Sequence, residues 1–501
     1  MRVIVPKITN LLASSITEDL TDWSTLTAYA SGAQAYVLKS DFPELITGSD
    51  CFFNTFSTDG AEWSFSATNT RYDCDGSQAG TSKLYQAIPA SKLVTGDQFL
   101  VEFEVAAFTA GTVAGYVAGV AGANASAVGY YQQLIVAGST NLFVGVVVSA
   151  DFVGSVTNIS VKKAGINCQR DIYESQTSQT GNFPPADDFT NWVRRSASVR
   201  WRMFDDYTNT QSAAPDIIHT KVDSSKCDAL ALFGVEGTNT QVIVTENSTN
   251  YIGTSVTSVA IGTGAKSFTA STGKLWAVGD TVEIENTADI LKFMLGTVTT
   301  YNSGTGALEV TVTDTQGSGT LNAWTIHYVY SNTSYDLVAT ESISWSDYFF
   351  SEIRYQTSAT KTFSLSYNSS CRVISTGATN QTVRTGHELV GTSKYLGETM
   401  PGISAGISDY SIIETNAYGE TYLSQGAFAK KLSFNFRVAT GSIDKVYDTL
   451  SQLRGIPCAW DANNDGTDLS LPVAYGIYDD FTEVVTLLNY TIVSVSIKGL
   501  I

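Results

Sequence analysis

The alternation of apolar and polar residues over short segments constrains the fold of this chain more than any other feature. In the segment FLVEFEVAA (residues 99–107), every second side chain from Phe99 to Val105 is apolar, so these side chains share one face of an extended strand. The same alternation recurs at residues 142–148 and 156–161, with Gly- and Asn-containing turns between the segments. The pattern predicts an all-β fold in which short antiparallel strands pair across tight turns.

Only one segment, Ser442–Arg454, has a helical period. Ser442 is a good N-cap residue, and Gly455 followed by Pro457 ends the segment. Five apolar side chains fall on one face of this helix: Ile443, Val446, Tyr447, Leu450 and Leu453.

At 501 residues the chain is too long for one hydrophobic core, because domains average roughly 150 residues. We therefore expect a multi-domain protein. The expected parts are a jelly-roll module at 1–163, a linker at 164–190 that contains Pro184 and Pro185, a β-rich domain formed by 191–252 plus 329–501, and a small β-barrel inserted at 253–328.

The charge balance argues against a nucleic-acid partner. The chain has 29 basic and 48 acidic residues, a net charge of −19, and such a surface repels a phosphate backbone. There is one basic cluster, interleaved with Trp192 and Trp201. Its arginines are expected either to lie over strand aromatics or to pair with nearby Asp residues; they are Arg194, Arg195, Arg200 and Arg202. No apolar run approaches the roughly 18 residues that span a bilayer, so membrane insertion is not expected.

The six cysteines are scattered without metal-binding spacing. Reduced core thiols are the expected state, although Cys51 and Cys74 are close enough in sequence to bridge within one module.

The N-terminus (MRVIVPKITN) lacks the apolar stretch of a signal peptide, which predicts synthesis in a cytoplasm without standard export. Only 15% of residues are charged, whereas soluble domains have roughly 25%. This low charged content is typical of β-rich extracellular or virion proteins. Release of an assembled particle by lysis reconciles the two observations.

Three segments of the first third resemble the carbohydrate-binding-module-like jelly rolls of bacteriophage tail proteins. They are LTDW at residues 20–23, YQAI at 85–88 and DFVGSVTNISVKK at 151–163. This resemblance implies a lectin-like module and a bacterial surface glycan as a ligand.

The remaining two thirds resemble a recurrent structural family of phage tails. The resemblance rests on DALALF (228–233), WSDYFF (345–350), YGETYLSQGAFAKKLSF (418–434), PCAW (457–460) and SIKGLI (496–501). Within this region, residues 257–269 (TSVAIGTGAKSFT) begin a block similar to a small β-barrel insert of tail and fibre proteins. The resemblance implies a virion protein of the tail tip, baseplate or an appendage, with other tail proteins as partners.

No constellation of residues indicates catalysis. His219, His327 and His387 lie in separate segments, no G-x-S-x-G motif occurs, and His327 in AWTIHY is expected on a strand surface. The adjacent carboxylates at 187–188, 205–206 and 479–480 point to opposite faces of a strand, so none forms a catalytic pair by itself. We expect no enzymatic activity. A glycan depolymerase remains an alternative, but the coil-length repeat of a β-helix is absent.

Two acidic turns are candidates for a structural calcium ion, and no other cofactor is expected. Asp461, Asn463 and Asp465 begin an EF-hand-like loop, although Pro472 occupies its twelfth position, where a Glu should be. The second turn contains Asp73 and Asp75.

Sugar binding requires an aromatic platform beside polar groups. The candidates are Trp63, Tyr72, Tyr130 and Tyr131, and one of the two adjacent tyrosines must face outward. Trp63 is expected to face inward if Phe65 does.

The sequence thus favours a structural tail protein, with a receptor-binding lectin and a glycan depolymerase as alternatives. The apolar segments at 345–350, 428–438 and 490–501 have few charges to protect strand edges. We therefore expect residues 190–501 to contact other copies or other tail proteins. A homo-oligomer, with a trimer favoured, is the expected assembly.

Overall fold

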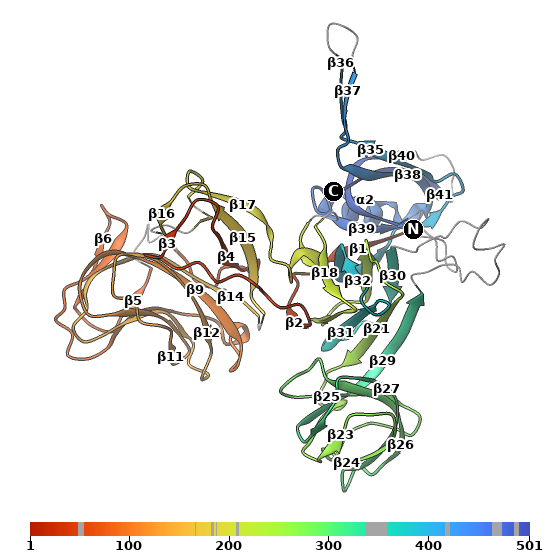
Figure 1. Cartoon of the computed structure of the whole chain (residues 1–501), viewed down its shortest axis with the longest axis horizontal. Coiled ribbons are helices and arrows are strands. Elements are labelled where there is room, and N and C mark those ends of the chain that lie inside the picture. The colour runs from red at the N-terminus through yellow and green to blue at the C-terminus, as the bar shows by residue number, and fades with distance from the viewer. Residues whose placement is uncertain are drawn as a thin grey trace. The chain divides into compact units, whose positions relative to one another are not determined.

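The computed structural model describes residues 1–48, 55–165, 167–181, 185–186, 188–206, 210–336, 358–415, 421–462, 473–484 and 490–500. Strands dominate these residues, which confirms the expected all-β, multi-domain class (Figure 1). The chain divides into two compact units. The sandwich unit contains Asn10–Leu12 and Glu18–Trp201, and the large unit contains Met1–Thr9, Ala13–Thr17 and Arg202–Ile501.

Two antiparallel five-stranded sheets form the sandwich unit. In order, the first contains β11 (Val120–Ala121), β10 (Val113–Val117), β13 (Phe143–Val148), β8 (Ser82–Ala87) and β5 (Ser57–Thr58). The second contains β12 (Gly129–Val136), β9 (Gln98–Ala110), β14 (Val153–Lys163), β7 (Arg71–Cys74) and β6 (Trp63–Ser66). Both sheets contribute to one core. Phe99, Val101, Phe103 and Val105 are all fully buried there, as their alternation predicted.

A third sheet of the sandwich unit has the order β17 (Trp192–Ala197), β15 (Gln169–Ser175), β4 (Gln34–Lys39). The linker expected at 164–190 is therefore wrong for the residues of β15, which are paired on both sides. Pro184 lies outside the described residues. Arg194 pairs with Asp171 at 2.7 Å and Arg195 with Glu174 at 2.7 Å, so the expected local ion pairs of the basic cluster are confirmed for these two arginines.

The first sheet of the large unit includes the N-terminal strand. Its order is β30 (Ser358–Thr362), β20 (Ala229–Phe233), β33 (His387–Tyr395), β1 (Arg2–Pro6), β39 (Cys458–Asp461), β40 (Val473–Val484), β41 (Tyr490–Gly499), β38 (Phe428–Ala439) and β34 (Glu398–Thr399), with β35 (Ser404–Asp409) also on β38. The amino group of Met1 donates to the Gly397 carbonyl at 2.8 Å. The predicted 1–163 boundary is therefore wrong at its start, because β1 belongs to the large unit.

The predicted helix is α2 (Ile443–Gln452), the only α-helix in the described part of the chain. Val446, Leu450 and Leu453 pack into the same core as Phe436 and Trp460. Ser442 holds the N-cap position without a side-chain cap hydrogen bond. Gly455 has φ +70°, a left-handed conformation that suits the residue after a helix.

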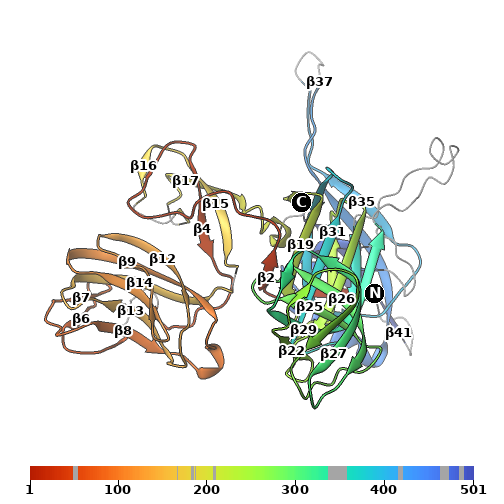
Figure 2. The same cartoon turned by 60° about the horizontal axis from the view of Figure 1, so that its bottom comes forward.

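The second sheet of the large unit curls to include the expected insert. Its order is β19 (Ile217–Asp223), β31 (Ser369–Thr376), β21 (Asn239–Glu246), β29 (Trp324–Asp336), β25 (Thr281–Asn286), β26 (Phe293–Tyr301), β27 (Ala307–Gln316) and β24 (Gly264–Thr269), and β22 (Ile252–Ser255) also pairs with β29. The strands between residues 252 and 321, together with the first residues of β29, surround a core of their own. Figure 2 shows these strands curling together. Strand β29 is continuous across the expected boundary at 328/329, and it pairs with β25 first and β21 afterwards.

The remaining short elements complete these units. They are β2 (Leu11–Ser14), β3 (Ala28–Tyr29) paired with β16 (Gln179–Thr180), β18 (Ser212–Pro215) with β32 (Thr382–Thr385), β23 (Val259–Ala260) with β28 (Thr320–Leu321), β36 (Ile412–Thr415) with β37 (Thr421–Ser424), and the 3-10 turns Ala90–Lys92, Arg202–Phe204 and Thr440–Ser442.

The five described cysteines are buried free thiols, which confirms the expected reduced state for them; they are Cys74, Cys168, Cys227, Cys371 and Cys458. Cys51 lies outside the described residues. Among the helices that the structure describes, none has the length and apolar character needed to cross a membrane.

Strands β38 and β41 were expected to offer open, unprotected edges, and this expectation is wrong. They pair with each other, and β41 is covered on its other side by β40 and β38 by β34 and β35. The third segment, 345–350, lies outside the described residues.

Candidate functional site

Two of the four candidate sugar contacts belong to the sandwich core. Trp63 is 7% exposed and its indole nitrogen donates to the Ser82 hydroxyl at 3.0 Å. Tyr72 is 1% exposed and its hydroxyl accepts a hydrogen bond from the backbone of Phe56 at 3.0 Å. Neither ring presents a face on which a sugar could stack.

The adjacent tyrosines of β12 divide between two cores. Tyr131 stacks on Phe103 with ring centres 5.4 Å apart, and its hydroxyl donates to the Ala127 carbonyl. Tyr130 packs against the cluster that contains Trp23 and Trp192. Both side chains are half-buried, so neither is the open platform that the sequence suggested. A glycan contact at this pair stays a prediction.

The acidic turns do not gather into a calcium site in the described chain. Asp73 pairs with Arg71 at 2.8 Å. Asp75 accepts a hydrogen bond from the backbone of Ser77, and hydrogen bonding by Ser77 lowers the pKa of the Asp75 carboxyl. Asp461 is buried in β39, where its Oδ2 accepts a hydrogen bond from Thr360 at 2.7 Å. Asn463 and Asp465 lie outside the described residues. Within the described ranges, no three His, Cys, Asp or Glu side chains are placed to share a metal ion.

The densest group of charges in the large unit is a fully buried ionic network. Lys221 of β19 contacts Glu283 at 2.9 Å and also Glu285, both of β25. Arg372 of β31 contacts the same two carboxylates at 2.7 Å. Its guanidinium also lies over the ring of Phe293 at 4.4 Å. The positive charges of Lys221 and Arg372 thus neutralise the negative charges of Glu283 and Glu285. This pairing offsets the free-energy cost of removing four charged groups from water.

Two histidines complete this network. His327 Nε2 lies 2.9 Å from Glu285 Oε1, and His219 Nε2 lies 2.5 Å from Arg372 Nη1. Burial, reinforced by Arg372, lowers the pKa of His219 to about 2, so this ring is neutral. The expectation that His327 lies on a strand surface is wrong, because it is 4% exposed. Every charged group here already has partners inside the fold, and the network links the insert strand β25 to β19 and β31.

A further buried acid, outside the ionic network, lies beside this sheet. Glu388 of β33 is 2% exposed, and its Oε2 accepts a hydrogen bond from the Thr220 hydroxyl at 2.8 Å. Its Oε1 has no hydrogen-bond partner within the described chain. Burial raises the pKa of the Glu388 carboxyl to about 7. We therefore expect Glu388 to make the stability of the large unit depend on pH.

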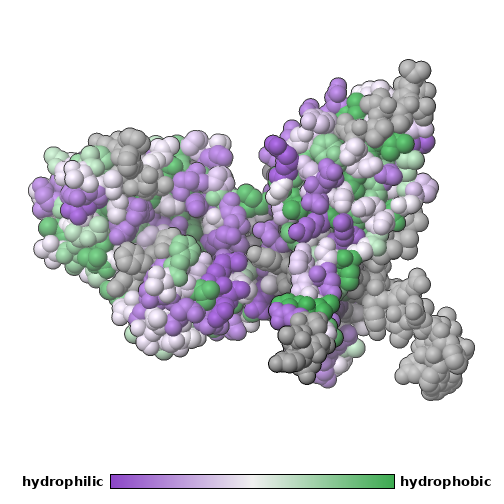
Figure 3. Space-filling model, turned by 90° about the horizontal axis from the view of Figure 1, so that it is seen from above, coloured by the Kyte–Doolittle hydropathy of each residue, from purple (hydrophilic) through white to green (hydrophobic). Residues whose placement is uncertain are grey.

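Many exposed apolar side chains lie on a projecting hairpin, which we call the arm (residues 404–415 and 421–428). β35 runs along β38 and leaves it at Asp409, after which β36 and β37 pair only with each other (Figure 1). Large apolar side chains with exposures of 58–75% lie along it: Ile407, Ile412, Ile413, Tyr422, Leu423 and Phe428. Green side chains gather at the arm in the view from above (Figure 3).

Both faces of the arm carry apolar groups. Ile413 lies directly opposite Leu423 on one face, whereas Glu414 lies opposite Tyr422 on the other. The segment was quoted in the sequence resemblance but was not identified as a hairpin. Its signal is the short apolar pair Ile412–Ile413 and the TYL segment at 421–423 on either side of NAYG, without the strict alternation of a half-buried strand.

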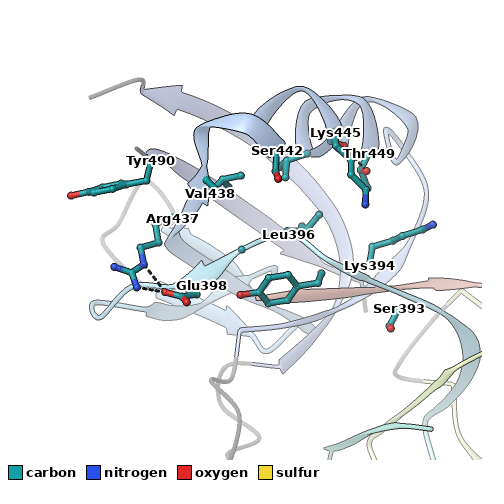
Figure 4. Close-up of a pocket in the computed structure, with 14 residues that line it drawn as sticks. Ser393, Lys394, Leu396, Glu398, Arg437, Val438, Ser442, Lys445, Thr449 and Tyr490 are labelled. Atoms are coloured by element: carbon teal, nitrogen blue, oxygen red, sulfur yellow. Dashed lines mark hydrogen bonds and ion pairs between the residues drawn. The ribbon is translucent and has the colours of Figure 1, made fainter. Parts of the chain in front are cut away.

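A groove of about 680 Å³ lies between the end of β33, the end of β38 and helix α2. Lys394 and Lys445 line one end, and the ion pair of Arg437 with Glu398 lines the other, next to Tyr490 (Figure 4). Tyr395 adds a ring that is 65% exposed, and Leu396, Val438 and Val446 form a buried apolar floor. The groove thus combines positive charge with an aromatic and apolar lining.

No known protein family matches the sequence. No curated protein matches it either. The proposed function therefore rests on the geometry of the residues and on the resemblance of the sequence segments described above.

Proposed function

We propose that the protein is a structural subunit of a bacteriophage tail adsorption apparatus, located in the virion as part of the tail tip, baseplate or an appendage. It assembles with other copies of itself and with other tail proteins. The observation that carries this proposal is the arm, a hairpin whose two faces both expose large apolar side chains.

The physical argument concerns what such a hairpin needs. An isolated two-stranded hairpin is only marginally stable in water, and contiguous exposed apolar surface marks an interaction site. Beyond Asp409 the strands of the arm have no partner in the described chain except each other. Covering the arm with a neighbouring subunit supplies both the missing burial and the missing support. Each apolar side chain buried in this way contributes about 1.5–3 kcal/mol.

The tail assignment is supported by the resemblance of residues 190–501 to tail structural proteins and by the β-sandwich of the first unit. Strand-rich subunits with projecting hairpins suit a permanent assembly, in which interfaces are large and apolar. Contact with a bacterial surface glycan and trimeric symmetry stay predictions of the sequence.

The test replaces the paired apolar residues of the arm, Ile413→Ser with Leu423→Ser, in a phage that carries only this copy of the gene. We expect the variant to fold but to be incorporated into tails at least about 100-fold less, because about 3 kcal/mol or more of burial is lost. Quantitative mass spectrometry of purified particles measures incorporation, and circular dichroism checks the fold.

The matched control is Val278→Ser on the insert, a side chain that is 72% exposed. It removes a similar apolar group outside the arm, so incorporation should stay normal. Normal incorporation of the Ile413/Leu423 variant would contradict the proposal.

A further inference from the structure

We propose that the arm of one copy docks in the groove of a second copy of this chain. The inference rests on the proposed function, because it takes the arm to be the assembly contact and names its binding site. It follows from where the two surfaces lie on β38 and from their chemistry.

The arm and the groove lie at opposite ends of one strand. The arm leaves the sheet beside Phe428, where β38 begins, whereas Arg437 lines the groove near the end of β38. At about 3.3 Å per residue these two points are roughly 30 Å apart. Beyond β35, strands β36 and β37 project away from the sheet and from helix α2, which lines the groove (Figure 1). An arm therefore meets the groove of another molecule rather than its own.

The charges of the two surfaces are complementary. The described arm contains Asp409 and Glu414 and no basic residue. The groove is lined by Lys394, Arg437 and Lys445 against the single acid Glu398, a net positive surface on a chain of net charge −19. Asp444 and Asp448 of α2 do not line it.

Lys394 and Lys445 are the charged groups of the groove that can form ion pairs with a ligand. Arg437 is already held by Glu398, whereas neither Lys394 nor Lys445 forms an ion pair with the described chain. Such complementarity steers association and fixes the register of a contact.

The apolar groups also fit one face of the arm. Ile412, Glu414 and Tyr422 lie on the same face of the β36–β37 ladder. In the docked state Glu414 meets Lys394 and Lys445, while Tyr422 and Ile412 pack on Tyr395 and the apolar floor of the groove. The opposite face of the hairpin carries Ile413 and Leu423. In the docked state these two side chains pack against the rim of the groove of the second copy.

A contact between two different surfaces of identical chains is heterologous. Repetition of such a contact gives a closed ring when the rotation closes and a filament when it does not. The homo-oligomer expected from the sequence is then a ring held by successive arms.

The test uses two charge-reversed versions of the purified full-length protein. The first carries Glu414→Lys, so the face of its arm that meets the groove has a positive charge at position 414, like its own groove. The second carries Lys394→Glu with Lys445→Glu, so its arm and its groove are both negative. Each alone should lose self-association at least about tenfold at low salt, as measured by sedimentation velocity.

An equimolar mixture of the two versions should regain assemblies in which they alternate, because each arm then meets an oppositely charged groove. The control is Glu309→Lys, an exposed charge reversal on the insert, which should associate like the wild type. A mixture that stays dissociated, or single versions that associate normally, overturns the inference.

The outcome also separates this inference from the proposed function. If the Ile413/Leu423 variant is excluded from tails but the charge-reversed mixture shows no recovery, the arm is an assembly contact whose site is not this groove. Wild-type protein that stays monomeric at high micromolar concentration likewise overturns the groove assignment, while the arm then docks on a different tail protein.

Discussion

At the scale of single residues, the alternation of side chains predicted which strands have one apolar and one polar face. It did not predict which residues pack against the polar face. In β25, Val282 and Ile284 alternate with Glu283 and Glu285, yet all four are buried. The two glutamates face Lys221 and Arg372, which come from distant segments of the chain. Pairing across a curled sheet is a long-range property, and the period of one strand contains no information about it.

Glu388 leads to a prediction at this scale about pH. The carboxyl has an ordinary pKa of 4.5 in the unfolded chain and about 7 in the folded protein. Between these values the folded state keeps a proton that the unfolded state has lost, so stability falls as the pH rises from about 4.5 to about 7. Glu388→Gln should remove this fall and stabilise the protein above pH 7 by up to about 3 kcal/mol.

Urea unfolding at a series of pH values measures this effect. The matched control is Glu236→Gln, which removes an exposed carboxylate paired with Arg384 and should leave the pH profile almost unchanged. A Glu388→Gln profile that still declines between pH 4.5 and 7 as steeply as the wild type would refute the assignment.

At the scale of elements, much of the organisation could be predicted from the sequence. The strands of residues 99–161 and the helix at 443–452 appear where the patterns placed them, because burial on one face enforces each period. The strand at 169–175 was assigned to a linker because its sequence, QRDIYES, is polar. The ion pairs and the strand partners that hold it in the sheet are remote in sequence, so they could not be predicted from the segment itself. The arm was missed for the opposite reason, because its apolar residues are not buried in this chain.

That residues 253–328 fold as a separate unit stays a prediction. The structure adds that removing this insert would also remove part of the buried ionic network. Deleting 253–328 removes Glu283 and Glu285 and leaves Lys221 and Arg372 without their acidic partners. A deletion that keeps the rest of the large unit folded must therefore also replace these two cations.

A double-mutant cycle tests the network that joins these elements. Glu285→Gln alone should destabilise the large unit by about 3–5 kcal/mol, because it leaves a buried cation uncompensated. Lys221→Met alone should cost a similar amount. The double variant restores the balance of charge and should cost less than the sum of the two, by at least about 1 kcal/mol in urea unfolding. Additive losses would show that the two groups are not coupled.

At the scale of the whole molecule, we propose that the arm is the element through which this chain joins other subunits. Its apolar side chains are exposed in the single chain, and the groove at the other end of β38 offers a complementary surface. The apolar segments of the sequence, with few charges at their edges, pointed to assembly through strand edges. The structure pairs β38 and β41 within the chain, and we propose that the arm carries the assembly contact instead.

An electron-microscopy map of the intact phage particle is the sharpest test of the role proposed for the arm. We predict density for this chain in the tail, with Ile413, Tyr422 and Leu423 buried against a neighbouring subunit. A map in which the chain occupies the tail but its arm projects into solvent, touching no other subunit, would show that the arm is not the assembly contact.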